Sequence, residues 1–219
     1  MSDGSSANPG SAGRRGGRRP KGVVRSGLVE AGIDLARAAG PDAVTLREAT
    51  RIVGVAPNAA YRHFADRDAL LNAVCVAAMR LLVERMEYEM ALVPARKGTK
   101  SGATARLSAV GTAYLGFAAS EPGLFDTVFA VPGHIRFSAG HPDDAAAGRT
   151  PLLVLSEVLD ELVAAGVFPA RRRPNAEFTV WSCVHGMAML RNHGPLRDMP
   201  AAASQALADA LRAFVLRGI

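Results

Sequence analysis

The chain has 219 residues, of which 49% are hydrophobic, 21% charged and only 5% aromatic. This composition argues against an all-β fold and predicts one or two closely packed domains. Two cysteines far apart in the sequence argue against a disulfide scaffold. The sequence shows neither a secretory signal nor the roughly 18 consecutive apolar residues that a membrane span needs. We therefore expect a cytoplasmic protein without a membrane partner.

The first 25 residues are predicted to form a disordered basic arm. They hold six of the 26 Lys and Arg residues but one of the 20 acidic residues, so most of the net charge of +6 lies there. Gly, Ser, Ala, Asn and Pro make up most of the rest, and such a segment cannot bury enough apolar surface to fold. The arm either follows DNA phosphates or keeps the protein soluble. Its candidate DNA contacts are Arg18, Arg19, Lys21 and Arg25.

Two helices are predicted after the arm. Apolar residues recur at helical spacing over residues 26–39, and Gly40, followed by a proline, ends that helix. A capping box then begins a short helix at Thr45. The Thr45 hydroxyl can accept from the Glu48 amide, and the Glu48 carboxylate can accept from the Thr45 amide.

A tight turn separates this short helix from a third. Gly54 interrupts the second helix, and Pro57 suits the first turn of a new one, so residues 45–64 are predicted as helix, turn, helix. This geometry places a second helix in the major groove of DNA, while groups at helix starts hold phosphates. Tyr61 and His63 lie at the end of the predicted third helix, where their side chains can donate hydrogen bonds to DNA phosphates. Many helical hairpins contain a glycine for structural reasons alone, so the geometry leaves that interpretation open.

The rest of the chain is also predicted to be helical. Asp66 starts a long helix that continues to about residue 90, and a polar linker covers residues 94–102. Another helix ends at residues 121–123, and a connector helix follows over residues 124–129. Residues 131–150 show no clear period. Three more helices are expected over residues 151–163, 176–192 and 201–216, so the predicted fold class is all-α, with no strand and no internal repeat.

The N-terminal part of this pattern resembles the TetR-type transcriptional regulators. The resemblance departs from the family pattern at Ala56, a poor N-cap that costs about 1 kcal/mol. In the C-terminal half, a Trp-x-x-x-His-Gly motif formed by Trp181, His185 and Gly186 is similar to the signature of one subgroup. The N-terminal resemblance is carried, at family spacing, by Leu28-Val29, Ala31, Gly40, Thr45-Leu46-Arg47, Gly54-Val55, Tyr61-Arg62-His63-Phe64, Arg67 and Leu70-Leu71.

The resemblance implies a ligand-responsive regulator, most simply a repressor, that binds a palindromic DNA operator as a homodimer. It implies a helix-turn-helix DNA-binding domain over residues 26–68 and a helical ligand-binding and dimerisation domain over residues 69–219. The recognition helix would cover residues 57–63. Base contacts are expected at Pro57, Asn58 and Ala59, and phosphate contacts at Thr45, Arg47, Tyr61, His63 and Arg67.

A different class of protein remains possible on the sequence. A helical small-molecule-binding protein or scaffold could keep the helix-turn-helix as a structural unit without using it on DNA. The helix over residues 176–192 is apolar nearly all round, so we expect one side to face its own domain and the other a partner subunit.

The expected effector is an apolar or amphipathic small molecule. Large apolar residues at helical spacing, with few acids or bases among them, form the predicted pocket, although the same composition would also build a solid core. His185 is either a core histidine or a ligand contact. The predicted pocket residues are Met86, Tyr114, Phe117, Phe129, Phe178, Trp181, His185 and Met189.

No cofactor, metal or catalytic role is expected. His134, His141, His185 and His193 lack Cys, Asp or Glu companions at ligand spacing, apart from two aspartates in the loop that carries the first two. Cys75 and Cys183 are expected to be small buried hydrophobes. The sequence contains no phosphate-binding glycine loop, no Gly-x-Ser-x-Gly and no His-Glu-x-x-His, so an enzyme is disfavoured.

Overall fold

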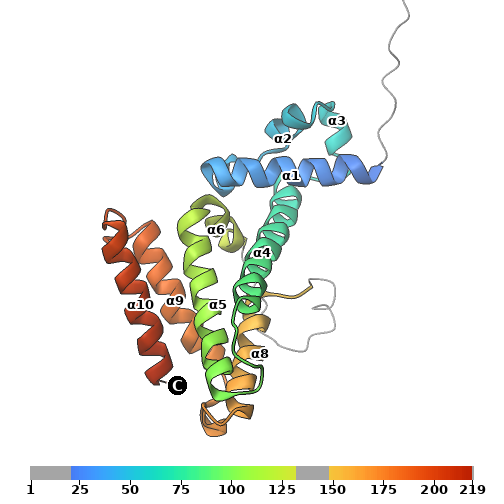
Figure 1. Ribbon diagram of the computed structural model, residues 1–219. Coiled ribbons are helices and arrows are strands. Elements are labelled where there is room, and N and C mark those ends of the chain that lie inside the picture. Colours follow the sequence, from blue (N-terminus) through green and yellow to red (C-terminus); the bar gives the residue numbers. More distant parts are fainter. Residues whose placement is uncertain (1–20, 132–147, 219) are drawn as a thin grey trace, which may run out of the picture.

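The computed structural model describes residues 21–131 and 148–218 (Figure 1). Within those two ranges every regular element is a helix, which confirms the all-α prediction. The candidate DNA contacts Arg18 and Arg19 lie outside the described residues, as do His134, His141 and most of the segment without a clear period.

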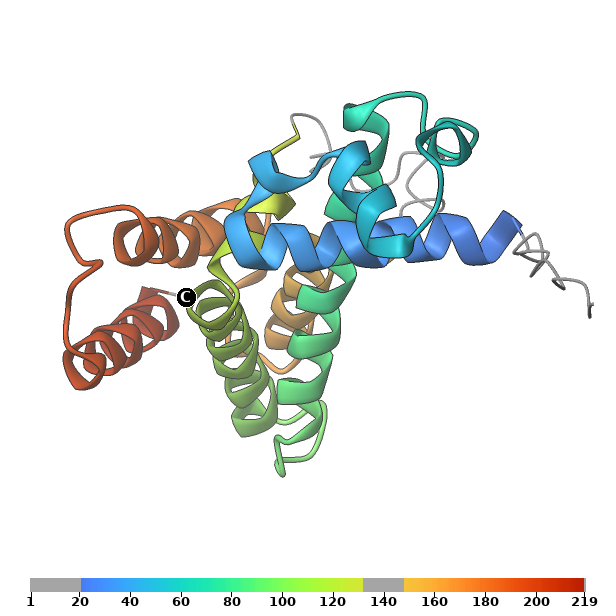
Figure 2. The same ribbon diagram turned by 90° about the horizontal axis from the view of Figure 1, so that it is seen from above.

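The N-terminal domain is a three-helix unit at one end of the molecule. It consists of α1 (Lys21–Ala39), α2 (Leu46–Val53) and the short α3 (Pro57–Ala60). Figures 1 and 2 show α1 crossing the end of the long helix α4 (Arg67–Ala91), which runs into the second domain. Leu28, Phe64 and Leu70 are all buried, so α1 and the start of α4 enclose one hydrophobic core.

The C-terminal domain is a larger bundle built around α4 and α5. The remaining helices are α5 (Lys100–Ser120), α6 (Pro122–Phe129), α8 (Pro151–Ala164), α9 (Ala176–Asn192) and α10 (Ala201–Gly218). Helix α8 packs on α4 and α5, and α9 packs on α5 and α8. Helix α10 is the outermost layer and packs on α9 and α5 (Figure 1).

Side-chain caps confirm two of the predicted helix starts, at Thr45 and Asp66. The Thr45 hydroxyl accepts from the Glu48 amide at 3.2 Å, and an Asp66 carboxylate oxygen accepts from the Ala69 amide at 2.8 Å. Each bond satisfies one of the amides that the first turn of a helix leaves without a partner. Gly54 ends α2 in the left-handed conformation at φ 71°, which a side chain would disfavour.

The first helix corrects one prediction, because it begins at Lys21 rather than at residue 26. Lys21 and Arg25 therefore belong to the helix and not to an arm without structure. Val24, one turn before Leu28, is buried and extends the apolar stripe of α1 by that turn. The Arg25 guanidinium lies 5.2 Å from the centroid of the Phe64 ring, a cation–π contact within the folded domain.

The recognition helix is shorter than predicted. Helix α3 ends at Ala60, and the next three residues form a turn in which the amides of His63 and Phe64 both donate to the Ala60 carbonyl oxygen, at 2.8 and 2.9 Å. Ala56 caps α3 with no side-chain hydrogen bond. Tyr61 and His63 therefore lie in the turn that follows α3, and not in the helix itself.

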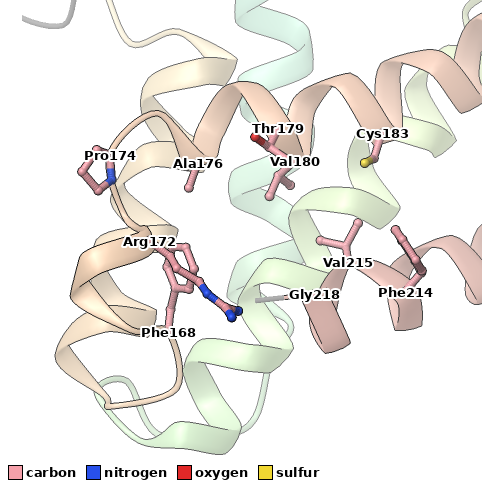
Figure 3. A pocket seen from close by; sticks show the side chains of 10 residues that line it. All are labelled: Phe168, Arg172, Pro174, Ala176, Thr179, Val180, Cys183, Phe214, Val215 and Gly218. Atoms are coloured by element: carbon pink, nitrogen blue, oxygen red, sulfur yellow. The ribbon is translucent and has the colours of Figure 1, made fainter.

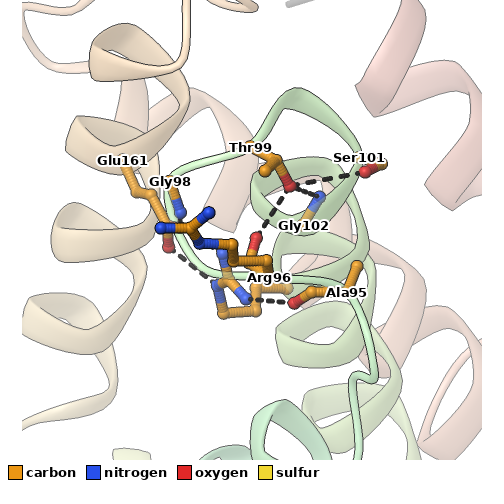
Figure 4. A network of polar contacts seen from close by, with 8 residues as sticks. Ala95, Arg96, Gly98, Thr99, Ser101, Gly102 and Glu161 are labelled. Atoms are coloured by element: carbon orange, nitrogen blue, oxygen red, sulfur yellow. Dashed lines mark hydrogen bonds and ion pairs between the residues drawn. The ribbon is translucent and has the colours of Figure 1, made fainter.

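A polar cluster ties the connection between α4 and α5 to α8 (Figure 4). Arg106 on α5 forms a two-pronged ion pair with Glu161 on α8, and both side chains are nearly buried. Glu161 also accepts from the Gly98 amide at 2.9 Å. This pairing lowers the pKa of Glu161, because the Arg106 hydrogen bond favours the carboxylate.

Within the two described ranges, no helix is both long and apolar enough to cross a lipid bilayer.

Candidate DNA-binding and effector-binding sites

The outer edge of the N-terminal domain carries the predicted base contacts. Pro57 and Asn58 are exposed, and Ala59 is partly exposed, on the single turn of α3. Ala60, the last residue of α3, is fully buried and fixes the turn to the core, so Pro57 and Asn58 lie on its outer side. Asn58 therefore offers an amide, which is suited to a base edge, between two small apolar residues.

The predicted phosphate contacts surround the same edge. The Tyr61 side chain is 59% exposed, and Arg47 is exposed on the first turn of α2. The Thr45 oxygen accepts from an amide, so the hydroxyl proton is still available for a phosphate. His63 is half-buried in the turn after α3.

Arg67, also a predicted phosphate contact, has a structural task in the free protein. Its Nε and one terminal nitrogen donate to the carbonyl oxygens of Val44 and Pro41, at 3.0 and 2.8 Å. These bonds fasten the connection between α1 and α2 to the start of α4. The guanidinium is therefore occupied by the loop that positions Thr45.

In the C-terminal domain, four predicted pocket residues meet in one aromatic cluster. The rings of Tyr114, Phe129, Trp181 and His185 come from α5, α6 and α9, and the centroids of Phe129 and His185 lie 4.7 Å apart. The cluster also contains Phe125, whose ring centroid is 5.1 Å from that of Phe129. The sequence prediction missed Phe125, although it precedes Phe129 by four residues and so shares its helix face.

One hydroxyl joins the polar atoms of this aromatic cluster. The Trp181 indole nitrogen donates to the Tyr114 oxygen at 3.0 Å, and that oxygen lies 2.9 Å from Nδ1 of His185. Because the Tyr114 oxygen accepts from Trp181, its own proton can be donated to Nδ1 of His185 when that nitrogen is unprotonated. Burial lowers the pKa of His185 and raises that of Tyr114, which keeps both groups uncharged.

The other four predicted pocket residues differ in burial. Met86 and Phe117 are buried in the general core, and Phe178 is half-buried on α9. Met189 is 40% exposed, which corrects its assignment to the interior. Eight residues along a helix turn the side chain about 80° away from Trp181, far enough to leave the inner stripe.

A hollow of about 250 Å³ opens between α9 and α10 (Figure 3). Its walls include Val180, Cys183, Phe214 and Val215, with Arg172 at one side. None of the residues predicted for the effector lines it. The hollow therefore belongs to the outer helix pair and not to the aromatic cluster.

The two cysteines differ in environment. Cys75 is fully buried, as predicted, and burial raises its pKa to about 11. Cys183 is only half-buried, because it faces the hollow between α9 and α10. In the part of the chain that the structure describes, no three His, Cys, Asp or Glu residues converge as metal ligands would.

Two family models match the chain. Residues 28–74 match the family described as "Bacterial regulatory proteins, tetR family", and residues 107–215 match a "Tetracyclin repressor-like, C-terminal domain". The first range contains the helix-turn-helix, and the second contains every residue of the aromatic cluster. No curated protein sequence matches the chain.

Several solved structures share the fold. A protein of unknown function from Rhodococcus sp. RHA1 is 22% identical, with a TM-score of 0.71 over 94% of this chain and 98% of that one. FadR from Bacillus subtilis, in complex with stearoyl-CoA, is 14% identical, with a TM-score of 0.59 over 89% and 98%. The regulator PfmR from Thermus thermophilus is 21% identical, with a TM-score of 0.53 over 87% and 97%.

Proposed function

Since the chain belongs to the TetR family of bacterial transcriptional regulators, we propose that it is a repressor that binds a palindromic operator as a homodimer and releases it when a small molecule binds. The observation that carries the proposal is the exposure of Asn58 on α3 and of Tyr61 directly after it, within the range that matches the tetR family model.

The exposed residues support a specific pattern of DNA contacts. Asn58 can bond both N6 and N7 of adenine, while the flanking Pro57 and Ala59 offer apolar contact to thymine methyl groups. Each half-site should therefore contain an adenine next to thymines. Tyr61 and Arg47 contact phosphates, which position the domain without reading the sequence.

The outer helix pair supports the proposed dimer. Met189 and Leu190 on α9 are exposed, and Phe214 on α10 is 61% exposed, so an apolar surface faces away from the protomer. Small residues at Ser182 and Gly186 continue the exposed face of α9 and allow close helix approach. Two copies of α9 and α10 can bury this surface as a four-helix interface.

The aromatic cluster is the proposed effector site. Its rings offer apolar contact, and the shared hydroxyl of Tyr114 gives an amphipathic ligand a hydrogen-bonding group in an otherwise apolar surrounding. A ligand that enters must separate Tyr114 from His185 or Trp181, so binding and rearrangement of the cluster are one event.

Selection of genomic DNA fragments on the purified protein tests the DNA-binding function. The recovered sequences should share an inverted repeat with adenine at one fixed position in each half. Asn58→Ala should alter the base preference at that position by about 1–3 kcal/mol, whereas Tyr61→Ala should weaken binding to all DNA sequences alike. Tyr88→Ala is the control, because Tyr88 is an equally exposed tyrosine far along α4. Failure to enrich any fragment would support a helical binding protein or scaffold instead.

Light scattering tests the dimer. Phe214→Glu should convert the dimer to a monomer, because a carboxylate would be buried without a partner at the interface. Leu92→Glu replaces a similarly exposed apolar residue at the end of α4 and should leave the dimer intact. A monomeric wild-type protein would contradict the proposed interface.

The effector step is tested with Trp181, the one tryptophan in the chain. Stearoyl-CoA, the compound bound in the FadR structure, is the first probe, followed by other acyl-CoAs and apolar metabolites. An effector should change the fluorescence emission of Trp181 at the concentration that releases the operator. Operator DNA should lower the affinity for that effector by the same factor as the effector lowers the affinity for the operator. Compounds that bind without any effect on operator affinity would disprove the ligand switch.

A further inference from the structure

The side chain of Arg67, the first residue of α4, reaches back to the connection between α1 and α2. This connection consists of Gly40, the 3-10 turn η1 (Pro41–Ala43) and Val44, and it leads into the N-cap of α2. Arg67 donates from Nε to the Val44 carbonyl oxygen at 3.0 Å, and from a terminal nitrogen to the Pro41 carbonyl oxygen at 2.8 Å. The two bonds therefore hold the connection at both ends of the 3-10 turn.

The bond to Val44 has a direct effect on Thr45, the N-cap of α2. A peptide unit is planar, so a hydrogen bond to its carbonyl oxygen also constrains the Cα atom that follows. The unit that contains the Val44 carbonyl ends at the Cα atom of Thr45. The Val44 side chain is fully buried, which anchors the same unit to the core. Arg67 thus helps to fix the position of Thr45, whose hydroxyl caps α2 and is a predicted phosphate contact.

This contact requires an arginine. The Nε and one terminal nitrogen lie on one edge of the planar guanidinium and donate as a rigid fork, whereas a lysine ammonium is a compact charge on a flexible stem. A lysine at position 67 would keep the positive charge, but it could not reproduce the fork toward two carbonyl oxygens. The charge of Arg67 and its geometry can therefore be separated by substitution.

The charges around Arg67 disfavour a phosphate contact. Its two terminal nitrogens lie 3.6 Å and 3.8 Å from carboxylate oxygens of Asp42 and Asp68, respectively. Both carboxylates are exposed, so the ion pairs add little to stability. Their two negative charges nevertheless exceed the single positive charge of the guanidinium. A DNA phosphate that approached Arg67 would therefore meet a group of net negative charge.

We infer that Arg67 is a positioning residue for operator binding, which holds Thr45 and the start of α2 in place and makes no phosphate contact of its own. The inference rests on the proposed function, because it requires an operator at the N-terminal domain. It replaces the phosphate contact that the sequence predicts at this residue. Arg47 is the contrasting case, since it is exposed on the first turn of α2 and its charge is free to act on a phosphate directly.

Two pairs of variants separate geometry from charge. Arg67→Lys keeps the charge but loses the fork, and Arg67→Gln loses the charge but keeps one amide donor. Arg47→Lys and Arg47→Gln make the same changes at a proposed phosphate contact. Arg85→Gln is the control, because Arg85 forms an exposed ion pair with Glu89 far along α4. The affinity of each full-length variant for the duplex recovered by genomic selection is measured over a range of salt concentrations, at a temperature where circular dichroism shows it folded.

Both Arg67 variants should bind the duplex at least about fivefold more weakly than the wild type, the equivalent of one net hydrogen bond. Their slopes of log affinity against log salt should equal that of the wild type, because no phosphate contact is lost. Arg47→Lys should bind nearly as the wild type does, whereas Arg47→Gln should flatten the slope by about 0.9 in each protomer. Arg85→Gln should change neither quantity. A residue that served stability alone would lower the melting temperature and leave the affinity of the folded protein unchanged.

Hydrogen exchange in the free protein tests the positioning step without DNA. The Glu48 amide, which donates to the Thr45 hydroxyl at 3.2 Å, should exchange faster in both Arg67 variants and at the wild-type rate in Arg85→Gln. An unchanged rate in the Arg67 variants would contradict the inference.

Three binding results would overturn the inference and leave the proposed function standing. Arg67→Lys could bind as tightly as the wild type, Arg67→Gln could flatten the salt slope as Arg47→Gln does, or both Arg67 variants could keep wild-type affinity. Failure of the wild type to bind any duplex would instead end the proposed function, and the inference with it. If Arg67→Gln does not fold, Arg67→Lys decides alone, because a phosphate contact tolerates lysine and the fork does not.

Discussion

Removal of the Tyr114 hydroxyl should destabilise the C-terminal domain. Tyr114→Phe deletes the oxygen that both Trp181 and His185 contact, while the ring stays in place against Phe125. Each neutral hydrogen bond contributes about 1 kcal/mol net, and a buried partner left without one costs about 1–3 kcal/mol. Trp181 and His185 are only half-buried, so water reaches them in part and the lower end applies. We expect a loss of about 2 kcal/mol in the free energy of unfolding.

Urea denaturation at fixed protein concentration measures this loss, because a dimer's stability depends on concentration. The midpoint should fall with an unchanged slope, and the melting temperature should drop by about 4–8 °C for a chain of this size. Tyr88→Phe is the control, since the Tyr88 side chain is exposed and its hydroxyl loses only water. A loss below about 0.5 kcal/mol in Tyr114→Phe would refute the shared-hydroxyl arrangement, because ordinary surface substitutions fall in that range.

Three further predictions concern the pH dependence of stability, the ion pair between Arg106 and Glu161, and the N-terminal arm. Burial lowers the pKa of His185 below its usual 6.5, so the unfolded chain takes up a proton that the folded imidazole refuses, and stability falls as the pH drops through 6.5. His185→Gln should therefore lose less melting temperature between pH 8 and pH 5 than the wild type. Arg106→Met, which leaves Glu161 nearly buried and unpaired, should cost about 3 kcal/mol in urea denaturation, against less than about 0.5 for Arg51→Met in an exposed pair. Deletion of residues 1–20 should reduce the slope of log affinity against log salt by up to about 0.9 per lost phosphate contact, and an unchanged slope would leave the arm a solubilising role.

Local signals predict the helices well, because helix ends depend on neighbours in sequence. Thr45, Gly54 and Asp66 act within four residues of themselves, and each occupies its expected place. The start of α1 is not predictable in this way, because the burial of Val24 depends on packing within the folded domain and not on the tail composition beside it.

The candidate sites are predictable in part for the same reason. Helix periodicity correctly groups Trp181 with His185, but it places Met189 inside because a stripe of residues four apart drifts around a helix. Periodicity also cannot show that Arg67 bonds two carbonyl oxygens from residues more than 20 positions away. A Cβ atom at Gly123 of α6 would clash with the backbone carbonyl oxygen of Ala36 in α1, and no local sequence pattern reveals such a distant contact.

The Cys75 thiol of α4 donates to the Thr127 carbonyl oxygen of α6 at 2.6 Å, so the rate at which this thiol is alkylated reports the separation of α6 from α4. Alkylating reagents attack the thiolate, and a fully buried thiol with a pKa of about 11 is scarcely ionised near neutral pH. Modification of Cys75 must therefore wait until α6 opens, whereas the half-buried Cys183 has no such requirement. With a large excess of reagent, the rate of the slow labelling phase, followed by mass spectrometry, gives the rate of this opening.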